Sequence, residues 1–200
     1  MAAKVGLIIL CYFLGSIPFS YLVPKTAKGV DIRQVGSGNV GATNVLRNMG
    51  WLYGILAMLL DIAKGVLAAY IGVRWGGSTF LTCLCAGAVV LGHCYSPFLK
   101  FVGGKGVATA GGVVIYLMPL AAVILVIWFV LVVAVKRYVS LGSVLTAAAL
   151  PLAAYLNGQT SAIIWLCIIL AAFVIYKHRP NNERLLKGTE PRLGKKVGES

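Results

Sequence analysis

The feature that most constrains this chain is a set of long apolar runs without a charged residue. Residues 5–24 form one such run and residues 107–135 form another. In the core of a bilayer, every backbone N–H and C=O group must find a partner within the protein, and helices of about 20 apolar residues meet that condition. The sequence therefore predicts an all-α fold, a polytopic membrane helix bundle that forms a single integral-membrane domain over residues 1–200.

The apolar runs predict seven transmembrane helices. Five of them are separated by polar segments and cover residues 5–24, 51–73, 79–97, 139–156 and 160–176. The run 107–135 is harder to interpret, because one helix of 29 residues would be about 43 Å long, against a hydrocarbon core of about 30 Å. Pro119 lies near the middle of this run and favours a hairpin of two short spans.

The basic residues predict how the bundle is oriented. Only Lys4 precedes the first span, whereas Lys25, Lys28 and Arg33 follow it. Cytoplasmic loops of membrane proteins carry an excess of Lys and Arg, so we expect the N-terminus outside and the C-terminus in the cytoplasm. With a hairpin at 107–135, the basic C-terminal segment also falls on the cytoplasmic side.

The net charge of +13 bears on the partners of the chain. A basic protein can bind nucleic acid or anionic membrane lipids, and basic residues gathered at the ends of apolar spans favour lipids. We therefore expect membrane lipids as partners and no nucleic acid. The five cysteines lie in or beside apolar runs without a CxxC pair, which indicates buried thiols. The few histidines and carboxylates are widely scattered, so neither a metal site nor a cofactor is expected.

Three polar segments, here called islands, stand out between the spans. The first island covers residues 29–50, the second 92–109 and the third 177–192. In the second island, Gly103, Gly104 and Gly106 flank Lys105. Glycine lets backbone N–H groups approach a ligand closely, and successive N–H groups form concavities that bind anions such as phosphate. If the topology is right, all three islands meet on the cytoplasmic face and bind a phosphorylated ligand.

The first island contains a G-x-G-x-x-G pattern at Gly36, Gly38 and Gly41, with Asp61 twenty residues further on. This resembles a dinucleotide fingerprint, but that motif requires a preceding β-strand, and here a membrane helix precedes it. What remains is a glycine loop followed by a short helix whose first N–H groups can face an anion. Alternatively, the loop is only a tight turn and Arg47 reaches lipid phosphate.

Ionisable residues within the predicted spans require partners. Asp61 and Lys64 are three residues apart on one helix, and mutual neutralisation as a structural pair is favoured over catalysis. His93 comes at the end of the third span, where a hydrogen-bonding role is as plausible as chemistry. In the third island, His178 and Glu183 have the spacing of a possible acid–base pair, but Pro180 between them argues against a regular helix.

The islands carry a close family resemblance. The segments GSGNVGATNVLR (36–47), GHCYSPFLKFVGGKGVATAGGV (92–113) and HRPNNERLLKGTEPRLG (178–194) are similar to the three motifs of the bacterial acyl-phosphate-dependent glycerol-3-phosphate acyltransferases. This resemblance implies a seven-helix enzyme of the bacterial cytoplasmic (inner) membrane with its active site on the cytoplasmic face. It would move a fatty acyl group from acyl phosphate to the 1-hydroxyl of sn-glycerol 3-phosphate, giving lysophosphatidic acid and inorganic phosphate. The oligomeric state stays open, with a monomer as one option.

The resemblance also implies roles for individual residues. Those expected to hold glycerol 3-phosphate and the transition state are Ser37, Arg47, Lys105, His178 and Asn181. Those expected to contribute to binding of the substrates are Asn39, Thr43, Asn44, Gly103, Gly104, Gly106 and Ser143. Glu190 is expected to be structural and to tie the tail to a basic neighbour.

Two other function classes remain open at this point. A phosphate or organophosphate transporter could use the basic islands together with the Asp61–Lys64 pair, although no inverted repeat is visible in the sequence. A lipid-binding scaffold without activity would explain the charge but not the glycine loops.

Overall fold

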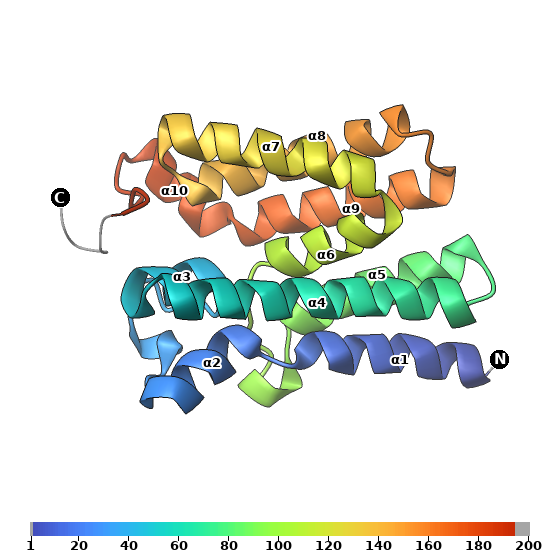
Figure 1. Cartoon of the computed structure of the whole chain (residues 1–200), viewed down its shortest axis with the longest axis horizontal. Coiled ribbons are helices and arrows are strands. Elements are labelled where there is room, and N and C mark those ends of the chain that lie inside the picture. Colours follow the sequence, from blue (N-terminus) through green and yellow to red (C-terminus); the bar gives the residue numbers. More distant parts are fainter. Residues whose placement is uncertain (1, 195–200) are drawn as a thin grey trace. The chain divides into compact units, whose positions relative to one another are not determined.

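The computed structural model describes residues 2–194, and within that range every regular element is helical (Figure 1). The α-helices are α1 (Ala2–Ser16), α2 (Phe19–Lys28), α3 (Ala42–Met49), α4 (Trp51–Trp75), α5 (Thr79–Cys94), α6 (Val107–Leu117), α7 (Pro119–Lys136), α8 (Val139–Leu156), α9 (Ser161–Lys177) and α10 (Arg179–Leu186). Two short 3₁₀ helices, η1 (Ile32–Gln34) and η2 (Pro97–Leu99), lie within the first and second islands. The predicted all-α class is confirmed.

Long apolar helices support the predicted membrane location. Within the described residues, five segments are long and apolar enough to cross a bilayer: Ala2–Lys28, Trp51–Trp75, Thr79–Leu99, Pro119–Lys136 and Val139–Leu156. A sixth results if α9 and α10, which meet at a bend of 56°, count as one span. Many side chains on α7 are more than half exposed although they are aliphatic, including Val123, Ile124 and Ile127. A surface of this kind suits lipid rather than water.

The predicted count of seven spans goes beyond what helix length supports. Each predicted span does contain a helix, but α6 has only 11 residues. At 1.5 Å per residue it is about 16 Å long, roughly half the thickness of the hydrocarbon core. Helix length therefore gives five or six spans, and α6 is a shorter apolar helix that length alone does not count among them.

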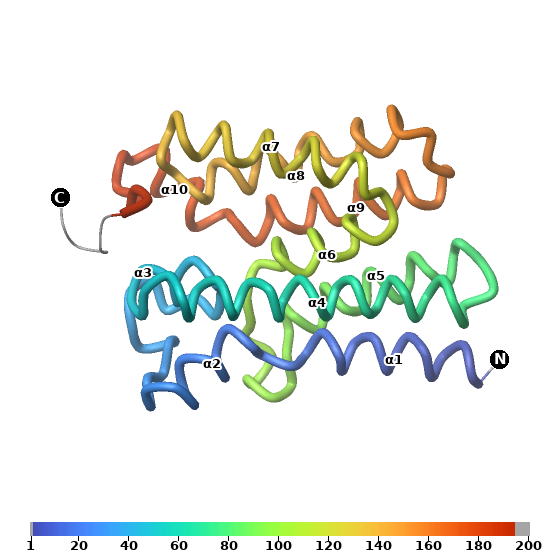
Figure 2. The backbone as a smooth tube through the Cα atoms, viewed as in Figure 1, coloured from blue at the N-terminus to red at the C-terminus, as the bar shows by residue number. Residues whose placement is uncertain are grey.

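The first predicted span, residues 5–24, falls within the candidate span Ala2–Lys28, which consists of two helices rather than one. The backbone leaves the helical path between α1 and α2, at Ile17 and Pro18 (Figure 2). Proline has no N–H to continue the hydrogen-bond ladder, and its ring clashes with the preceding turn. Pro24 lies inside α2, which continues to Lys28.

The predicted break at Pro119 is confirmed. Helix α6 ends at Leu117, Met118 takes a non-helical conformation (φ −145°, ψ 66°), and Pro119 occupies the first turn of α7. Proline is well placed there, because the first N–H groups of a helix have no partner within it.

The chain forms two compact units, one ending at Tyr116 and the other beginning at Leu117. In the first unit, α1 packs on α5 and α4, while α2 and α3 pack on α4. Glycines allow the close crossing of α1 and α5, since a Cβ atom at Gly15 would collide with the carbonyl of Val89 and one at Gly92 with that of Tyr12. In the second unit, α8 packs between α7 and α9, and α10 contacts both α8 and α9.

Candidate functional site

The first island is folded around the side chain of Asn44, at the start of α3. The amide oxygen of Asn44 accepts from the backbone N–H of Ser37 at 3.1 Å and from the Asn48 side chain at 2.9 Å. Its amide nitrogen lies within hydrogen-bond distance of three loop carbonyl oxygens, those of Ile32 (3.1 Å), Val35 (3.0 Å) and Asn39 (3.1 Å). One buried side chain thus determines the path of the glycine loop.

This geometry gives the predicted ligand residues of the first island different surroundings. Asn44 is only 3 % exposed, and its amide is engaged by the loop. Ser37 is exposed, whereas Asn39, Thr43 and Arg47 are partly buried. Gly36 and Gly38 adopt positive φ angles of 61° and 68°, which glycine tolerates and other residues rarely adopt. The predicted loop followed by a short helix is present.

The second island begins within α5, and its glycine loop, residues 103–106, lies against the end of that helix. The backbone N–H of Gly104 donates to the carbonyl oxygen of His93 at 3.2 Å. A Cβ atom at Gly103 would collide with that same carbonyl, and one at Gly104 would collide with the His93 ring. Gly106 has a φ of 82° and accepts the first hydrogen bond of α6 through its carbonyl. The loop that carries Lys105 therefore needs glycine for close approach at two positions and for backbone conformation at a third.

The first and second islands meet within the first unit. A Cβ atom at Gly104 would collide both with the His93 ring and with the carbonyl oxygen of Val40, which belongs to the first island. Val40 also shares a buried apolar cluster with Leu99 of the second island and with Val45 of α3. The structure thus brings together the two glycine loops that the sequence places more than fifty residues apart.

The third island is organised around Glu190. Its carboxylate accepts hydrogen bonds from Ser140 and Asn181, both at 2.7 Å, and pairs with Arg184 at 2.8 Å. Burial alone would raise the pKa of Glu190, but these three partners together hold the pKa below its usual range. The prediction that Glu190 contacts a basic neighbour is confirmed, and its buried contacts fit the structural role expected for it.

Three predicted site residues lie in the second unit. Asn181 is buried, and its amide nitrogen is bound to Glu190. His178 is buried, with its ring Nδ1 at 2.8 Å from the Val174 carbonyl oxygen, to which it donates. Ser143 is buried on α8, and its hydroxyl donates to the Val139 carbonyl at 2.9 Å. It lies three residues after Ser140, which binds Glu190.

The doubt about a regular helix at Pro180 was wrong. Helix α10 spans Arg179–Leu186 with Pro180 in its first turn, where a missing N–H costs nothing. Glu183 is on the exposed side of this helix and pairs with Arg179 at 3.3 Å, while His178 is buried. These positions give no support to an acid–base pair of His178 and Glu183.

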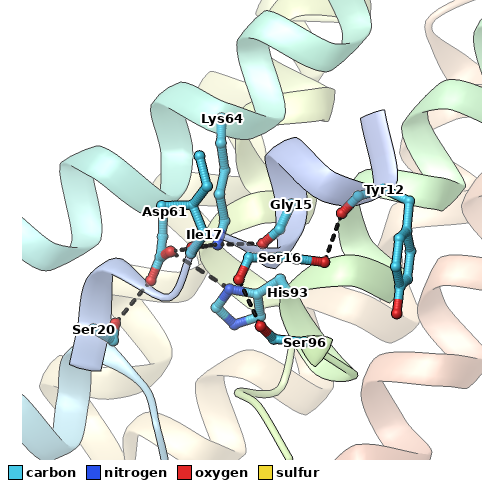
Figure 3. Close-up of polar contacts among 9 residues, drawn as sticks. All are labelled: Tyr12, Gly15, Ser16, Ile17, Ser20, Asp61, Lys64, His93 and Ser96. Carbon is cyan, nitrogen blue, oxygen red and sulfur yellow. Dashed lines mark hydrogen bonds and ion pairs between the residues drawn. The ribbon is translucent and has the colours of Figure 1, made fainter. Parts of the chain in front are cut away.

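The predicted pair of Asp61 and Lys64 forms, with 2.7 Å between Oδ1 and Nζ. It belongs to a larger buried network that the sequence did not reveal (Figure 3). Ser20 donates to the second carboxylate oxygen at 2.7 Å, and Nδ1 of His93 lies 3.5 Å from the first. The sequence did contain one signal for this network, which is Pro18 within the apolar run 5–24. A proline interrupts the helix, and the carbonyl groups at the break then need donors from other elements.

Comparisons with known proteins agree with this geometry. The family model described as glycerol-3-phosphate acyltransferase matches residues 5–188. A glycerol-3-phosphate acyltransferase of Syntrophomonas wolfei is 46% identical over 194 residues, which cover 97% of this chain and 99% of the relative. One of Carboxydothermus hydrogenoformans is 46% identical over 187 residues, covering 93% of this chain and 94% of the relative.

Solved structures show the same likeness. The crystal structure of PlsY (YgiH), an integral membrane glycerol 3-phosphate acyltransferase, in its glycerol 3-phosphate form has a TM-score of 0.92 and 42% identity, covering 96% of each chain. Its lysophosphatidic acid form has a TM-score of 0.90 and 41% identity, again covering 96% of each chain. With its two glycine loops in contact and its apolar helices, this chain belongs to the family of integral membrane glycerol-3-phosphate acyltransferases.

Proposed function

We propose that this protein transfers a fatty acyl group from acyl phosphate to the 1-hydroxyl of sn-glycerol 3-phosphate, giving lysophosphatidic acid and inorganic phosphate. The observation that carries the proposal is the contact between the two glycine loops, at Gly104 and Val40. This contact supports the proposal because it brings the backbone next to Lys105 close to the first island, so that N–H groups and cations from both can hold phosphate. The relatives whose structures are solved in a glycerol 3-phosphate form and a lysophosphatidic acid form support the acceptor and the product.

The proposed reaction needs mainly positioning and charge stabilisation. Acyl phosphate is a mixed anhydride with a good leaving group. The 1-hydroxyl oxygen attacks the acyl carbon, the bond from that carbon to the phosphate oxygen breaks, and phosphate departs with the electron pair. The hydroxyl proton passes to a substrate phosphate oxygen, so no protein base is required. A fixed cation near the developing negative charge lowers the barrier, since it needs no reorganisation during the reaction.

The residues divide into groups in this proposal. Ser37, Arg47, Lys105, His178 and Asn181 hold glycerol 3-phosphate and the transition state. Thr43, Ser143 and the glycines at 103, 104 and 106 bind the head of acyl phosphate. Asn39 and Asn44 act on the ligand through the shape of the first loop, because the Asn44 amide is already engaged by loop backbone. The proposal requires the third island to join the other two around the ligand.

We further propose the membrane arrangement that fits this chemistry. The chain forms one domain in the bacterial cytoplasmic membrane, with seven transmembrane helices, the N-terminus outside and the C-terminus inside. The acyl tail of the donor then lies in lipid, and the acceptor comes from the cytoplasm. A monomer contains every group that the proposal uses.

Purified protein in detergent, supplied with palmitoyl phosphate and glycerol 3-phosphate, tests the reaction. We expect lysophosphatidic acid and phosphate in equal amounts, measured by mass spectrometry and a phosphate assay. Formation of lysophosphatidic acid from acyl-coenzyme A but not from acyl phosphate would contradict the proposed donor. Uptake of glycerol 3-phosphate into vesicles without acyl transfer would favour a transporter instead.

Single cysteines placed at the exposed Lys187 and at the exposed Trp75 test the orientation, in a variant without native cysteines. In intact inverted vesicles a membrane-impermeant reagent should label position 187 and not position 75. The opposite pattern would overturn the proposed topology.

A further inference from the structure

The break between α1 and α2 takes the carbonyl groups of Gly15, Ser16 and Ile17 out of the regular helical ladder, and among the described residues only that of Ile17 accepts a backbone hydrogen bond nearby, from the N–H of Phe19 at 3.1 Å. Pro18 has no N–H, and the chain departs from helical geometry at Ile17. Two side chains from other elements replace the missing donors (Figure 3). Lys64 of α4 donates to the carbonyl oxygens of Gly15 at 2.8 Å and Ile17 at 3.0 Å, and Ser96 donates to that of Ser16 at 2.6 Å. The break is thereby tied to α4 and to the start of η2.

The charge that Lys64 brings into this region is balanced by Asp61, which in turn contacts two more elements. One carboxylate oxygen accepts from Ser20 of α2 at 2.7 Å, and the other lies 2.7 Å from Lys64 and 3.5 Å from Nδ1 of His93. Asp61 is 1 % exposed, and the His93 side chain is 8 % exposed. A buried group surrounded in this way has little freedom to reorient. The Nδ1 side of the His93 ring is therefore fixed by the membrane helices.

The opposite side of the same ring faces the glycine loop of the second island, residues 103–106. A Cβ atom at Gly104 would collide with Nε2 of His93, and the backbone N–H of Gly104 donates to the His93 carbonyl at 3.2 Å. Gly103 lies against that carbonyl as well. One residue thus contacts the buried network with one edge and the glycine loop with the other edge and its backbone.

The glycine loop at residues 103–106 needs a neighbouring group that holds its backbone in place. Glycine has more backbone freedom than any other residue, so the Gly103–Gly104–Lys105–Gly106 segment has little intrinsic preference for a single path. Lysine adds a flexible side chain, and its charge is well placed only if its backbone is. The His93 ring and the carbonyl of Val40 both limit the loop where it passes Gly104, because a Cβ atom there would collide with each of them.

We propose that His93 is a positioning residue of the acyl-transfer site: held by Asp61, its ring supports the Gly103–Gly104 backbone and fixes where Lys105 presents its charge. This inference rests on the proposed function, in which Lys105 holds substrate phosphate. His93 itself does not touch substrate. Its effect passes through the loop, because a displacement of about 1 Å at a catalytic group can cost roughly 100-fold in rate.

The test combines a graded series with a double-mutant cycle. His93→Ala should raise KM for glycerol 3-phosphate about tenfold or more, and His93→Asn should give an intermediate value, since its amide keeps a donor facing Asp61 but lacks the far edge of the ring. In a Lys105→Ala background, His93→Ala should change kcat/KM by less than about twofold, because both variants remove the same function. Binding of inorganic phosphate, followed by calorimetry, should weaken across the same series.

The matched control is Thr82→Val, at the other end of α5. Thr82 is buried, and its hydroxyl donates to the Ser78 carbonyl at 3.2 Å. This variant should lower thermal stability without changing KM or phosphate binding. If His93→Ala does not fold, as judged by size exclusion and thermal unfolding, His93→Asn carries the test with the same expected direction.

Several outcomes would overturn the inference. One is a wild-type KM in folded His93→Ala, and another is a change in kcat/KM that simply adds to that of Lys105→Ala. If the wild-type protein transfers no acyl group, the proposed function fails by itself, and the phosphate series still decides whether His93 supports the loop. If all His93 variants then bind phosphate as tightly as the wild type, the His93 ring does not position the glycine loop.

Discussion

Two buried carboxylates organise this protein in different ways. Asp61 lies within α4 and is 1 % exposed, and Glu190 follows α10 and is 6 % exposed. Each has a basic partner nearby in sequence, Lys64 for Asp61 and Arg184 for Glu190. Each also binds a hydroxyl group from a distant element, Ser20 for Asp61 and Ser140 for Glu190. Both carboxylates therefore connect segments that are far apart in the chain.

The difference lies in the basic partners. The Lys64 side chain is 1 % exposed and is surrounded by the carbonyl groups of the broken helix, whereas the Arg184 side chain is 38 % exposed. A buried charge that loses its partner has no water to replace it, while a partly exposed one does. We therefore expect the loss of Asp61 to lower the free energy of unfolding strongly, and the loss of Glu190 to lower it less. Lys105, which belongs to the second island, should matter chiefly for turnover.

The largest effect should come from Asp61→Asn. This change leaves Lys64 buried without a counter-charge, and we expect a loss of about 3–5 kcal/mol in unfolding free energy. Thermal and denaturant unfolding in detergent measure it. The double variant Asp61→Leu with Lys64→Met should cost less than Asp61→Asn. If it costs more, the carbonyl groups bound by Lys64 stabilise the protein more than the ion pair does.

Lys105→Ala should reduce turnover by about 100-fold or more, the scale of one lost electrostatic stabiliser. The midpoint of unfolding should stay close to that of the wild type, in contrast to Asp61→Asn. Formation of lysophosphatidic acid under saturating substrates measures the change, with Lys187→Ala, an exposed lysine after α10, as the matched control. Near-normal turnover would remove Lys105 from the site.

Glu190→Gln should cost about 1–3 kcal/mol at neutral pH, because it weakens hydrogen bonds and removes the ion pair with Arg184. The pKa of Glu190 is held below its ordinary value of 4.5 in the folded protein. The ionised carboxylate therefore stabilises the fold above about pH 4.5, and this contribution is lost as the pH falls through the lower folded pKa. The wild type and the variant should thus differ in unfolding midpoint at pH 6 and converge in acid. A difference that grows toward low pH would contradict this assignment.

The smallest effect should come from Glu183→Gln. Glu183 pairs with Arg179 on the surface of α10, and exposed ion pairs of this kind contribute less than about 1 kcal/mol. We expect turnover within about twofold of the wild type. Complete loss of activity in folded protein would revive an acid–base pair of His178 and Glu183.

Much of the fold could be predicted because it depends on local composition. The all-α class, the helical breaks at polar islands and the break at Pro119 all follow from hydrogen-bond satisfaction in lipid and from the chemistry of proline. The break at Pro18 has the same cause as the break at Pro119, because each proline lies within an apolar run. The lengths of the two helices in residues 107–135 could not be predicted, because the 11-residue α6 and the longer α7 form one apolar run in the sequence.

The candidate site was predictable in its parts and not in its arrangement. Helix spacing predicted the charge pair of Asp61 with Lys64, and a basic neighbour was expected for Glu190, which the structure shows to be Arg184. The resemblance to a family supplied the residue types of the site.

The sequence by itself determined that the chain is a membrane helix bundle with glycine loops and cations suited to phosphate, because these properties depend on residue type and short spacing. Only the tertiary structure showed that Gly104 lies close to both His93 and Val40, and that the Asn44 amide is engaged by its own loop. These contacts join elements far apart along the chain, and nothing in local composition specifies which distant carbonyl will meet which glycine.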